Sequence, residues 1–174
     1  MSNSSANKTD WKKKTAYIGI LLALALICSY VESLIPFSFG IPGVKLGLTN
    51  LVIVMALYCI GTREAVLISV LRILVSGFLF GNLFSILYSL AGALLSFLVM
   101  WGLKKTKKLK CVTVSMAGGI FHNIGQILVA AAVVENFSVL YYVPILLVSG
   151  LITGLLIGIL AQELVIRIGD RMKH

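Results

Sequence analysis

Long apolar runs, separated by short polar or charged stretches, make up most of the chain. The apolar segments cover residues 15–35, 46–60, 64–81, 83–103, 112–134 and 139–166. A helix needs roughly 20 mostly apolar residues to cross a bilayer, at about 1.5 Å of rise per residue. Most of the segments meet that length. The pattern therefore predicts an all-α fold: a polytopic membrane bundle of about six transmembrane helices.

The domain organisation follows from the same pattern. Residues 15–168 form one predicted transmembrane domain, because the chain is too short for two. Residues 1–14 are mostly polar and are expected to form a disordered cytoplasmic tail. Residues 169–174 are expected to form a second, shorter cytoplasmic tail.

The composition strengthens this interpretation. Of the 174 residues, 59% are hydrophobic and 12% are charged, whereas about a quarter of the residues in a soluble domain are charged. The three cysteines, Cys28, Cys59 and Cys111, do not have the spacing of a metal or redox motif. We interpret them as inert packing residues.

The net charge of +9 is concentrated at the ends of the apolar segments. Basic residues cluster at 8–14, 104–110 and 167–173. Cytoplasmic loops of membrane proteins carry an excess of Lys and Arg. With the N-terminus inside, 13 of the 15 basic residues lie on the cytoplasmic side, which predicts that both termini are cytoplasmic. The clusters do not alternate with exposed aromatic residues, so they do not indicate nucleic-acid binding.

The stretch 36–45 and the segment after it depart from plain spanning helices. The stretch contains two prolines and two glycines, so it cannot be helical throughout. The following segment is short, and Gly47 and Asn50 lie near its start. Short or interrupted segments often mark substrate sites in transporters. An ordinary outer loop followed by a short helix is the alternative interpretation.

Polar side chains inside the apolar segments are the informative exceptions, because they are costly in a bilayer unless they are paired or face water. Arg72 lies about half-way along the third segment, and His122, Asn123 and Gln126 lie on the fifth. His122 and Gln126 are four residues apart and share one helix face. We predict that these four residues line a polar cavity. Hydrogen bonding between helices without a ligand is the alternative.

Small residues recur at spacings that let helices approach closely. Gly19 and Ala23 form such a pair on the first segment, and Gly150, Gly154 and Gly158 form a longer series on the last. Both sets fit internal packing and also contact with a membrane partner. The longer series is the better candidate for a partner surface.

Several short runs resemble the signature of a known family. The runs are Ser29-Tyr-Val-Glu-Ser-Leu-Ile-Pro36, Pro42-Gly-Val-Lys-Leu-Gly-Leu-Thr-Asn50, Leu71-Arg-Ile-Leu74, Tyr88-Ser-Leu-Ala-Gly92 and Phe121-His-Asn-Ile-Gly-Gln126. They are similar to the bacterial membrane family labelled heptaprenyl diphosphate synthase component I, also called the Gx transporter family. The resemblance covers nearly all of residues 15–166 and implies a multi-pass protein of the bacterial cytoplasmic membrane.

The two family names imply different functions, and the residues favour transport. A polyprenyl diphosphate synthase binds magnesium and diphosphate through aspartate-rich motifs, since hard cations need clustered oxygen ligands. The two aspartates here, Asp10 and Asp170, lie in opposite terminal regions. The sequence also contains no glycine-rich phosphate loop, no Ser-His-Asp constellation and no Cys/His metal set. We therefore predict that the protein is not an enzyme and has no catalytic residue, metal or cofactor.

The layout also resembles the S components of energy-coupling-factor transporters, which are small six-helix proteins that capture vitamins or their precursors from outside. That resemblance implies a site for a small-molecule ligand in the outer half, under the 36–45 loop. The substrate-binding residues expected there are Glu32, Lys45, Asn50, Arg72, Asn82, Tyr88, His122, Asn123 and Gln126. Arg72 and Lys45 would offer charge to an anionic group, and the amides would orient it. Glu32 could neutralise either cation if the helices pack suitably.

The same resemblance implies protein partners, namely a scaffold membrane protein and two ATPases. S components commonly dock through an Ala-xxx-Ala patch on the first helix, and Gly19 and Ala23 are the corresponding residues here. The chain has no nucleotide-binding motif, so ATP energy would come from the partners. Two alternatives stay open: an accessory membrane subunit of prenyl diphosphate or quinone biosynthesis that binds a soluble synthase through residues 104–110, and a structural membrane subunit without a ligand.

Overall fold

The computed structural model describes residues 3–34, 47–135 and 137–173, and every element in these ranges is a helix. The elements are α1 (Asn3–Leu34), α2 (Leu48–Cys59), α3 (Thr62–Phe80), α4 (Leu83–Lys105), α5 (Cys111–Val134), the 3₁₀ helix η1 (Phe137–Tyr142) and α6 (Val143–Lys173). The predicted all-α fold is confirmed for this part of the chain. From α2 to α5, the helix ends agree with the predicted segments to within a few residues.

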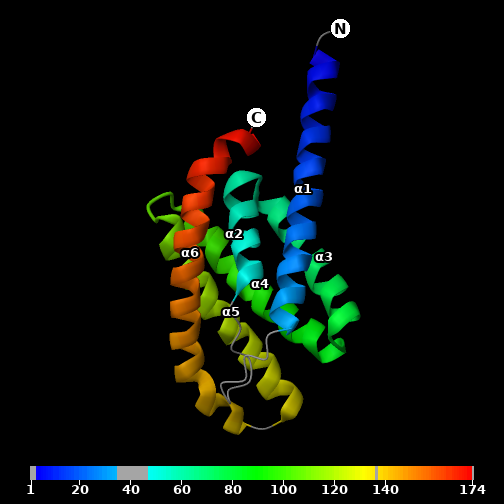
Figure 1. The fold of residues 1–174 in the computed structure, drawn as a ribbon. Helices are drawn as coiled ribbons and strands as arrows, with labels where there is room; N and C mark the ends of the chain where they lie inside the picture. Colours follow the sequence, from blue (N-terminus) through cyan, green and yellow to red (C-terminus); the bar gives the residue numbers. More distant parts are fainter. Residues whose placement is uncertain (1–2, 35–46, 136, 174) are drawn as a thin grey trace.

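Both chain ends lie at the same end of the bundle (Figure 1), which we call the terminal end. The turn between α2 and α3 and the loop between α4 and α5 are on this side as well. The opposite side, which we call the loop end, holds the turn between α3 and α4 and the helix η1. This arrangement agrees with an even number of membrane crossings. The count of six crossings and the cytoplasmic side remain predictions.

Several helices have the length and composition of membrane spans. The segments that meet both criteria are Trp11–Leu34, Leu83–Lys105, Cys111–Val133 and Val139–Gly169. The 12 residues of α2 reach roughly 18 Å, against roughly 30 Å for the hydrocarbon core of a bilayer. Helix α3 is longer but contains Arg63, Glu64 and Arg72. The chain is therefore membrane-embedded, and α2 and α3 are the helices that depend most on their neighbours.

The outer surface of the bundle carries many large apolar side chains. Phe78 of α3 is 78% exposed, and Leu94 of α4 and Ile166 of α6 are each 65% exposed. A soluble monomer rarely exposes extensive apolar patches. Contact with lipid accounts for this surface, because hydrocarbon is as apolar as these side chains.

Helix α2 forms the centre of the apolar core. Every residue from Val52 to Leu57 is buried, because α1, α3 and α6 all pack against this helix. The core continues through Leu21 of α1 and Ile68 of α3 and occupies the terminal half of the bundle. Lys104 of α4 donates a hydrogen bond to the Leu57 carbonyl oxygen, which satisfies the C-terminal end of α2. A short helix that is apolar on all sides is stable here because protein surrounds it.

Helix α5 contacts its two neighbours backbone to backbone. A Cβ atom added at Gly119 would lie 2.3 Å from the carbonyl oxygen of Gly150 on α6. One added at Gly125 would lie 2.6 Å from the carbonyl oxygen of Ala91 on α4. Small residues allow such approach in membranes, where packing rather than the hydrophobic effect holds helices together.

The glycine series on α6 is used inside the molecule. Added Cβ atoms at Gly154 and Gly158 would lie 2.7 Å and 2.8 Å from the Cα atoms of Met116 and Val112 on α5. We expected this series to be the better candidate for a partner surface. That expectation is wrong, because α5 covers this face of α6.

The chain termini are more helical than expected. Helix α1 begins at Asn3, so residues 3–14 are helical rather than a disordered tail. Lysine has good helix propensity, and a polar stretch can extend a helix that is already nucleated by the apolar part. Lys14 also pairs with Glu64 of α3, with 2.5 Å between the Nζ and Oε1 atoms. Similarly, α6 continues to Lys173 over most of the expected C-terminal tail.

Replacing Gly119 with alanine is expected to destabilise the contact between α5 and α6. The new methyl group would meet the backbone of Gly150, which has no flexible end that could move away. Overpacking of this kind costs about 1–3 kcal/mol. Thermal unfolding in detergent should therefore give a clearly lower Tm. Gly102→Ala is the matched control, because nothing lies within 4 Å of a Cβ atom added there. Equal stability of the two variants would contradict the close packing.

The predicted orientation can be tested by labelling single cysteines in a protein whose Cys28, Cys59 and Cys111 are replaced by alanine. Tyr141, at the loop end, is 87% exposed, and Lys107 lies in the exposed loop between α4 and α5. A membrane-impermeant maleimide should label Tyr141→Cys in intact cells, and Lys107→Cys only after the cells are permeabilised. The reverse pattern would show that the termini are outside.

Candidate functional site

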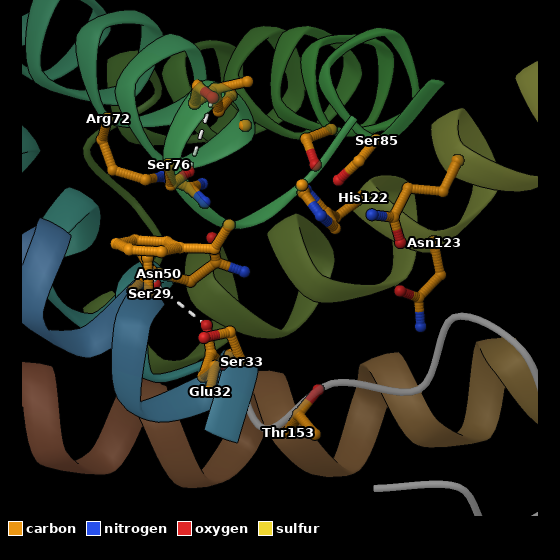
Figure 2. A pocket seen from close by; sticks show the side chains of 18 of the residues that line it. Ser29, Glu32, Ser33, Asn50, Arg72, Ser76, Ser85, His122, Asn123 and Thr153 are labelled. Carbon is orange, nitrogen blue, oxygen red and sulfur yellow. Dashed lines mark hydrogen bonds between the residues drawn. The ribbon is translucent and has the colours of Figure 1, made fainter. Parts of the chain in front are cut away.

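A cavity of about 150 Å³ opens between the helices at the loop end (Figure 2). All six α-helices contribute to its walls. The lining residues are Ser29, Glu32, Ser33, Gly47, Thr49, Asn50, Arg72, Ile73, Ser76, Gly77, Phe80, Gly81, Ser85, Ser89, Gly119, His122, Asn123, Gln126 and Thr153. Most of these residues have polar side chains, whereas the terminal half of the same bundle is an apolar core.

Most of the residues predicted for the site meet in this cavity. Those in its lining are Glu32, Asn50, Arg72, His122, Asn123 and Gln126. They come from α1, α2, α3 and α5, which are distant in the sequence and are brought together by the fold. Lys45 and the 36–45 loop lie outside the described residues. The role of the lining residues in binding remains a prediction.

Two predicted site residues lie elsewhere. Asn82 is exposed and forms the N-cap of α4, where its Oδ1 atom accepts a hydrogen bond of 2.8 Å from the Ser85 amide. An Asn in this position satisfies an unpaired amide of the first helical turn. Tyr88 does not line the cavity; its ring lies 5.8 Å from that of Phe84. Neither residue is in the cavity lining, and a role of either in binding stays a prediction.

Glu32 holds the start of α2 against the end of α1. Its Oε1 atom accepts a hydrogen bond of 2.8 Å from the Leu48 amide, and its Oε2 atom accepts one of 2.9 Å from the Thr49 hydroxyl. The N-cap residue of α2 is Gly47, whose φ of 74° lies in the left-handed region and which has no side chain to form a cap. Glu32 therefore supplies the cap from another helix, and its negative charge is favourable at the positive end of the α2 dipole.

Arg72 has a different environment. Its Nε atom is buried and has no hydrogen-bond partner within the described part of the chain. The charge of Glu32 acts on the guanidinium group, but the two side chains are not among the ion pairs of the described residues. Among the described residues, Glu32 and Arg72 therefore form no contact ion pair, and the two carboxylate oxygens accept hydrogen bonds from the start of α2 instead.

The polar residues of α5 differ in their hydrogen bonding. Asn123 donates a hydrogen bond of 2.7 Å from its Nδ2 atom to the Leu146 carbonyl oxygen of α6. Gln126 is 2% exposed, and its Nε2 atom has no partner among the described residues. Gly92 of α4 makes room for this part of α5, since a Cβ atom added there would lie 2.7 Å from the Gln126 Cγ atom. Sequence spacing placed His122 and Gln126 on one face, and both line the cavity.

The sequence analysis did not identify the hydroxyl groups of the cavity. Those in the lining belong to Ser29, Ser33, Thr49, Ser76, Ser85, Ser89 and Thr153. Ser29 and Ser33 are four residues apart, as are Ser85 and Ser89, so helical spacing could have revealed them. Serine and threonine are common in transmembrane helices because they can bond to their own backbone. A single serine or threonine in an apolar segment therefore does not indicate a cavity.

The size of the cavity suits a small polar group. A volume of about 150 Å³ is comparable with engineered protein cavities that hold a benzene molecule. Hydroxyl, amide, imidazole and guanidinium groups surround the space, so it can form many hydrogen bonds and can neutralise charge. Among the described residues, no group of three or more His, Cys, Asp or Glu side chains is placed to hold a metal ion.

The fold and cavity together define a class: small, helical, membrane-embedded proteins with a polar cavity between their helices. The chain matches the family described as heptaprenyl diphosphate synthase component I over residues 21–164, which is most of its length, and it belongs to that family. The match includes every predicted site residue from Glu32 to Gln126. The resemblance drawn from the sequence motifs is confirmed. No curated protein and no solved structure matches the chain.

Removing the Glu32 cap is expected to weaken the joint between α1 and α2. Glu32→Ala leaves the Leu48 amide without its acceptor and should lower the stability by about 2 kcal/mol, measured as a lower Tm in detergent. Ser33→Ala is the matched control, because among the described residues the Ser33 hydroxyl bonds to the Tyr30 carbonyl oxygen of its own helix and not to α2. Thr49→Val combined with Glu32→Ala should cost less than the sum of the single changes. Additive effects would contradict the coupling.

Proposed function

We propose that the protein is the substrate-binding component of a membrane transport system, similar to an S component, that captures a small organic ligand from the outer face. The cavity at the loop end carries this proposal. It combines a buried arginine with amide, imidazole and hydroxyl groups, in a bundle whose other half is an apolar core. Structural hydrogen bonding alone would satisfy these groups in pairs, without leaving a cavity between them.

The position of the cavity supports capture from outside. It lies at the end opposite the termini, and the predicted cytoplasmic side is the terminal end with its basic residues. Helix α2 blocks the way inward, since its residues from Val52 to Leu57 are buried in the core. Release of a ligand to the inside would therefore need movement of whole helices. An external energy source would drive that movement. We place the protein in the bacterial cytoplasmic membrane and assign it no catalytic step.

A partner would supply that energy, and α1 offers a surface for it. Gly19 and Ala23 are exposed, and nothing lies within 4 Å of a Cβ atom added at Gly19. We propose that this face docks on a scaffold membrane protein that carries ATPases. The ligand would be a small molecule of the vitamin-precursor or quinone-precursor type.

The family description favours a second candidate, in which the protein is a non-catalytic subunit of prenyl diphosphate synthesis. The words "component I" in that description imply that the synthase has at least one other component. The basic loop between α4 and α5 is exposed at the terminal end, where a soluble synthase could reach it. This candidate does not require the polar cavity, so we rank it second.

A pull-down of tagged protein in mild detergent, with mass spectrometry of the recovered proteins, separates the two candidates. We expect a membrane scaffold and ATPases. Gly19→Leu and Ala23→Leu should reduce their recovery by roughly tenfold, which corresponds to a loss of about 1.4 kcal/mol of interface packing. Gly102→Leu is the control, because its position on α4 is equally open.

Recovery of a prenyl diphosphate synthase instead, lost when Lys107 and Lys108 are changed to glutamate, would contradict the transport proposal. It would establish the second candidate. Recovery of the scaffold by all three leucine variants would keep the transport role and reject α1 as the docking helix.

A further inference from the structure

Two buried hydrogen-bond donors of residues that line the cavity have no acceptor among the described residues. The Arg72 Nε atom and the Gln126 Nε2 atom are buried, and neither has a partner within the described part of the chain. Both residues line the cavity. Buried donors without acceptors are rare in native proteins, and each one calls for a physical explanation.

No acceptor among the described residues contacts these two donor atoms. Glu32 provides the negative charge that acts on Arg72, yet both of its oxygens accept bonds from the start of α2. Two other polar residues of the lining bond to the backbone of α6. Asn123 donates to the Leu146 carbonyl oxygen, and the Thr153 hydroxyl donates to that of Ser149 at 2.9 Å. Within the described part of the chain, these two donor atoms therefore have no acceptor, and Arg72 has no contact ion pair.

A buried cation without a contact ion pair is destabilising unless something else compensates it. Water could satisfy the N–H groups, but it would not balance the charge. A guanidinium group is planar, carries several donors and matches the two oxygens of a carboxylate or phosphate. Arg72 is thus placed as the counter-charge for an oxygen-bearing anion.

We infer that the ligand of this cavity carries a carboxylate or phosphate group, which Arg72 neutralises and the Gln126 amide also hydrogen-bonds. This inference rests on the proposed function and specifies the class of substrate. Since the cavity holds a group of about benzene size, the anionic part of the ligand is small. Any larger apolar part would lie outside the polar lining.

The first test measures the stability of the ligand-free protein. If Arg72 is reserved for a ligand, Arg72→Met removes a buried charge without losing a protein contact, and the Tm should stay equal or rise. Gln126→Leu should behave in the same way. Asn123→Leu is the matched control on the same helix, and it should lower the Tm because it breaks the bond to Leu146. A drop for Arg72→Met as large as that for Asn123→Leu would overturn the inference, since Arg72 would then be structural.

The second test adds anions to purified protein. Sodium phosphate or sodium benzoate, compared with sodium chloride at the same ionic strength, should raise the Tm of the wild-type protein by roughly 3 °C through binding to the folded state. The effect should be absent in Arg72→Met and partly kept in Arg72→Lys, which retains the charge without the planar fork. Equal effects in all three proteins would overturn the inference.

The third test separates failure of the inference from failure of the proposed function. Small molecules that co-purify with the wild-type and Arg72→Met proteins are extracted and identified by mass spectrometry. An acid that is lost in Arg72→Met supports the inference. A neutral molecule that is retained in Arg72→Met overturns it and leaves the transport proposal intact. Displacement of bound phosphate by phosphatidylglycerol, but not by soluble acids, would assign the anion to a lipid headgroup and contradict the transport proposal.

Discussion

Backbone contact along α5 is the constraint on which the cavity depends. Gly119 approaches Gly150 of α6, and Gly125 approaches Ala91 of α4, so close that no side chain fits between the helices. In a bilayer, such contacts replace the hydrophobic effect as the force that holds helices together. They fix α5 between two neighbours and leave its polar residues, such as His122, facing the space that α1, α2 and α3 enclose.

The two ends of the bundle are held together by different kinds of interaction. At the terminal end, the core around α2 is apolar, and Lys14 and Lys104 tie α1 to α3 and α4 to α2. At the loop end, both Glu32 oxygens accept hydrogen bonds, while the Arg72 Nε atom has no partner within the part of the chain that the structure describes. Proteins accept a local loss of stability where function needs it.

Much of the helical arrangement could be predicted from the chain because length and apolar composition decide whether a segment can reside in lipid. The same reasoning misjudged the polar stretch before Lys14, since a helix can extend beyond the membrane once it is nucleated and tied to a neighbour through Glu64. It also could not tell that Asn82 caps its own helix instead of facing a ligand. Capping depends on backbone geometry that a residue type alone does not reveal.

The sequence by itself determined the membrane class, the helices and the family, because each depends on local composition and on short runs of residues. It also identified Arg72, His122, Asn123 and Gln126 as exceptions in an apolar background, because polar groups in lipid are rare. Only the tertiary structure decided which of these groups have partners. That decision depends on contacts between helices far apart in the chain: α6 accepts a bond from Asn123, α2 donates bonds to Glu32, and the Arg72 Nε atom has no partner among the described residues.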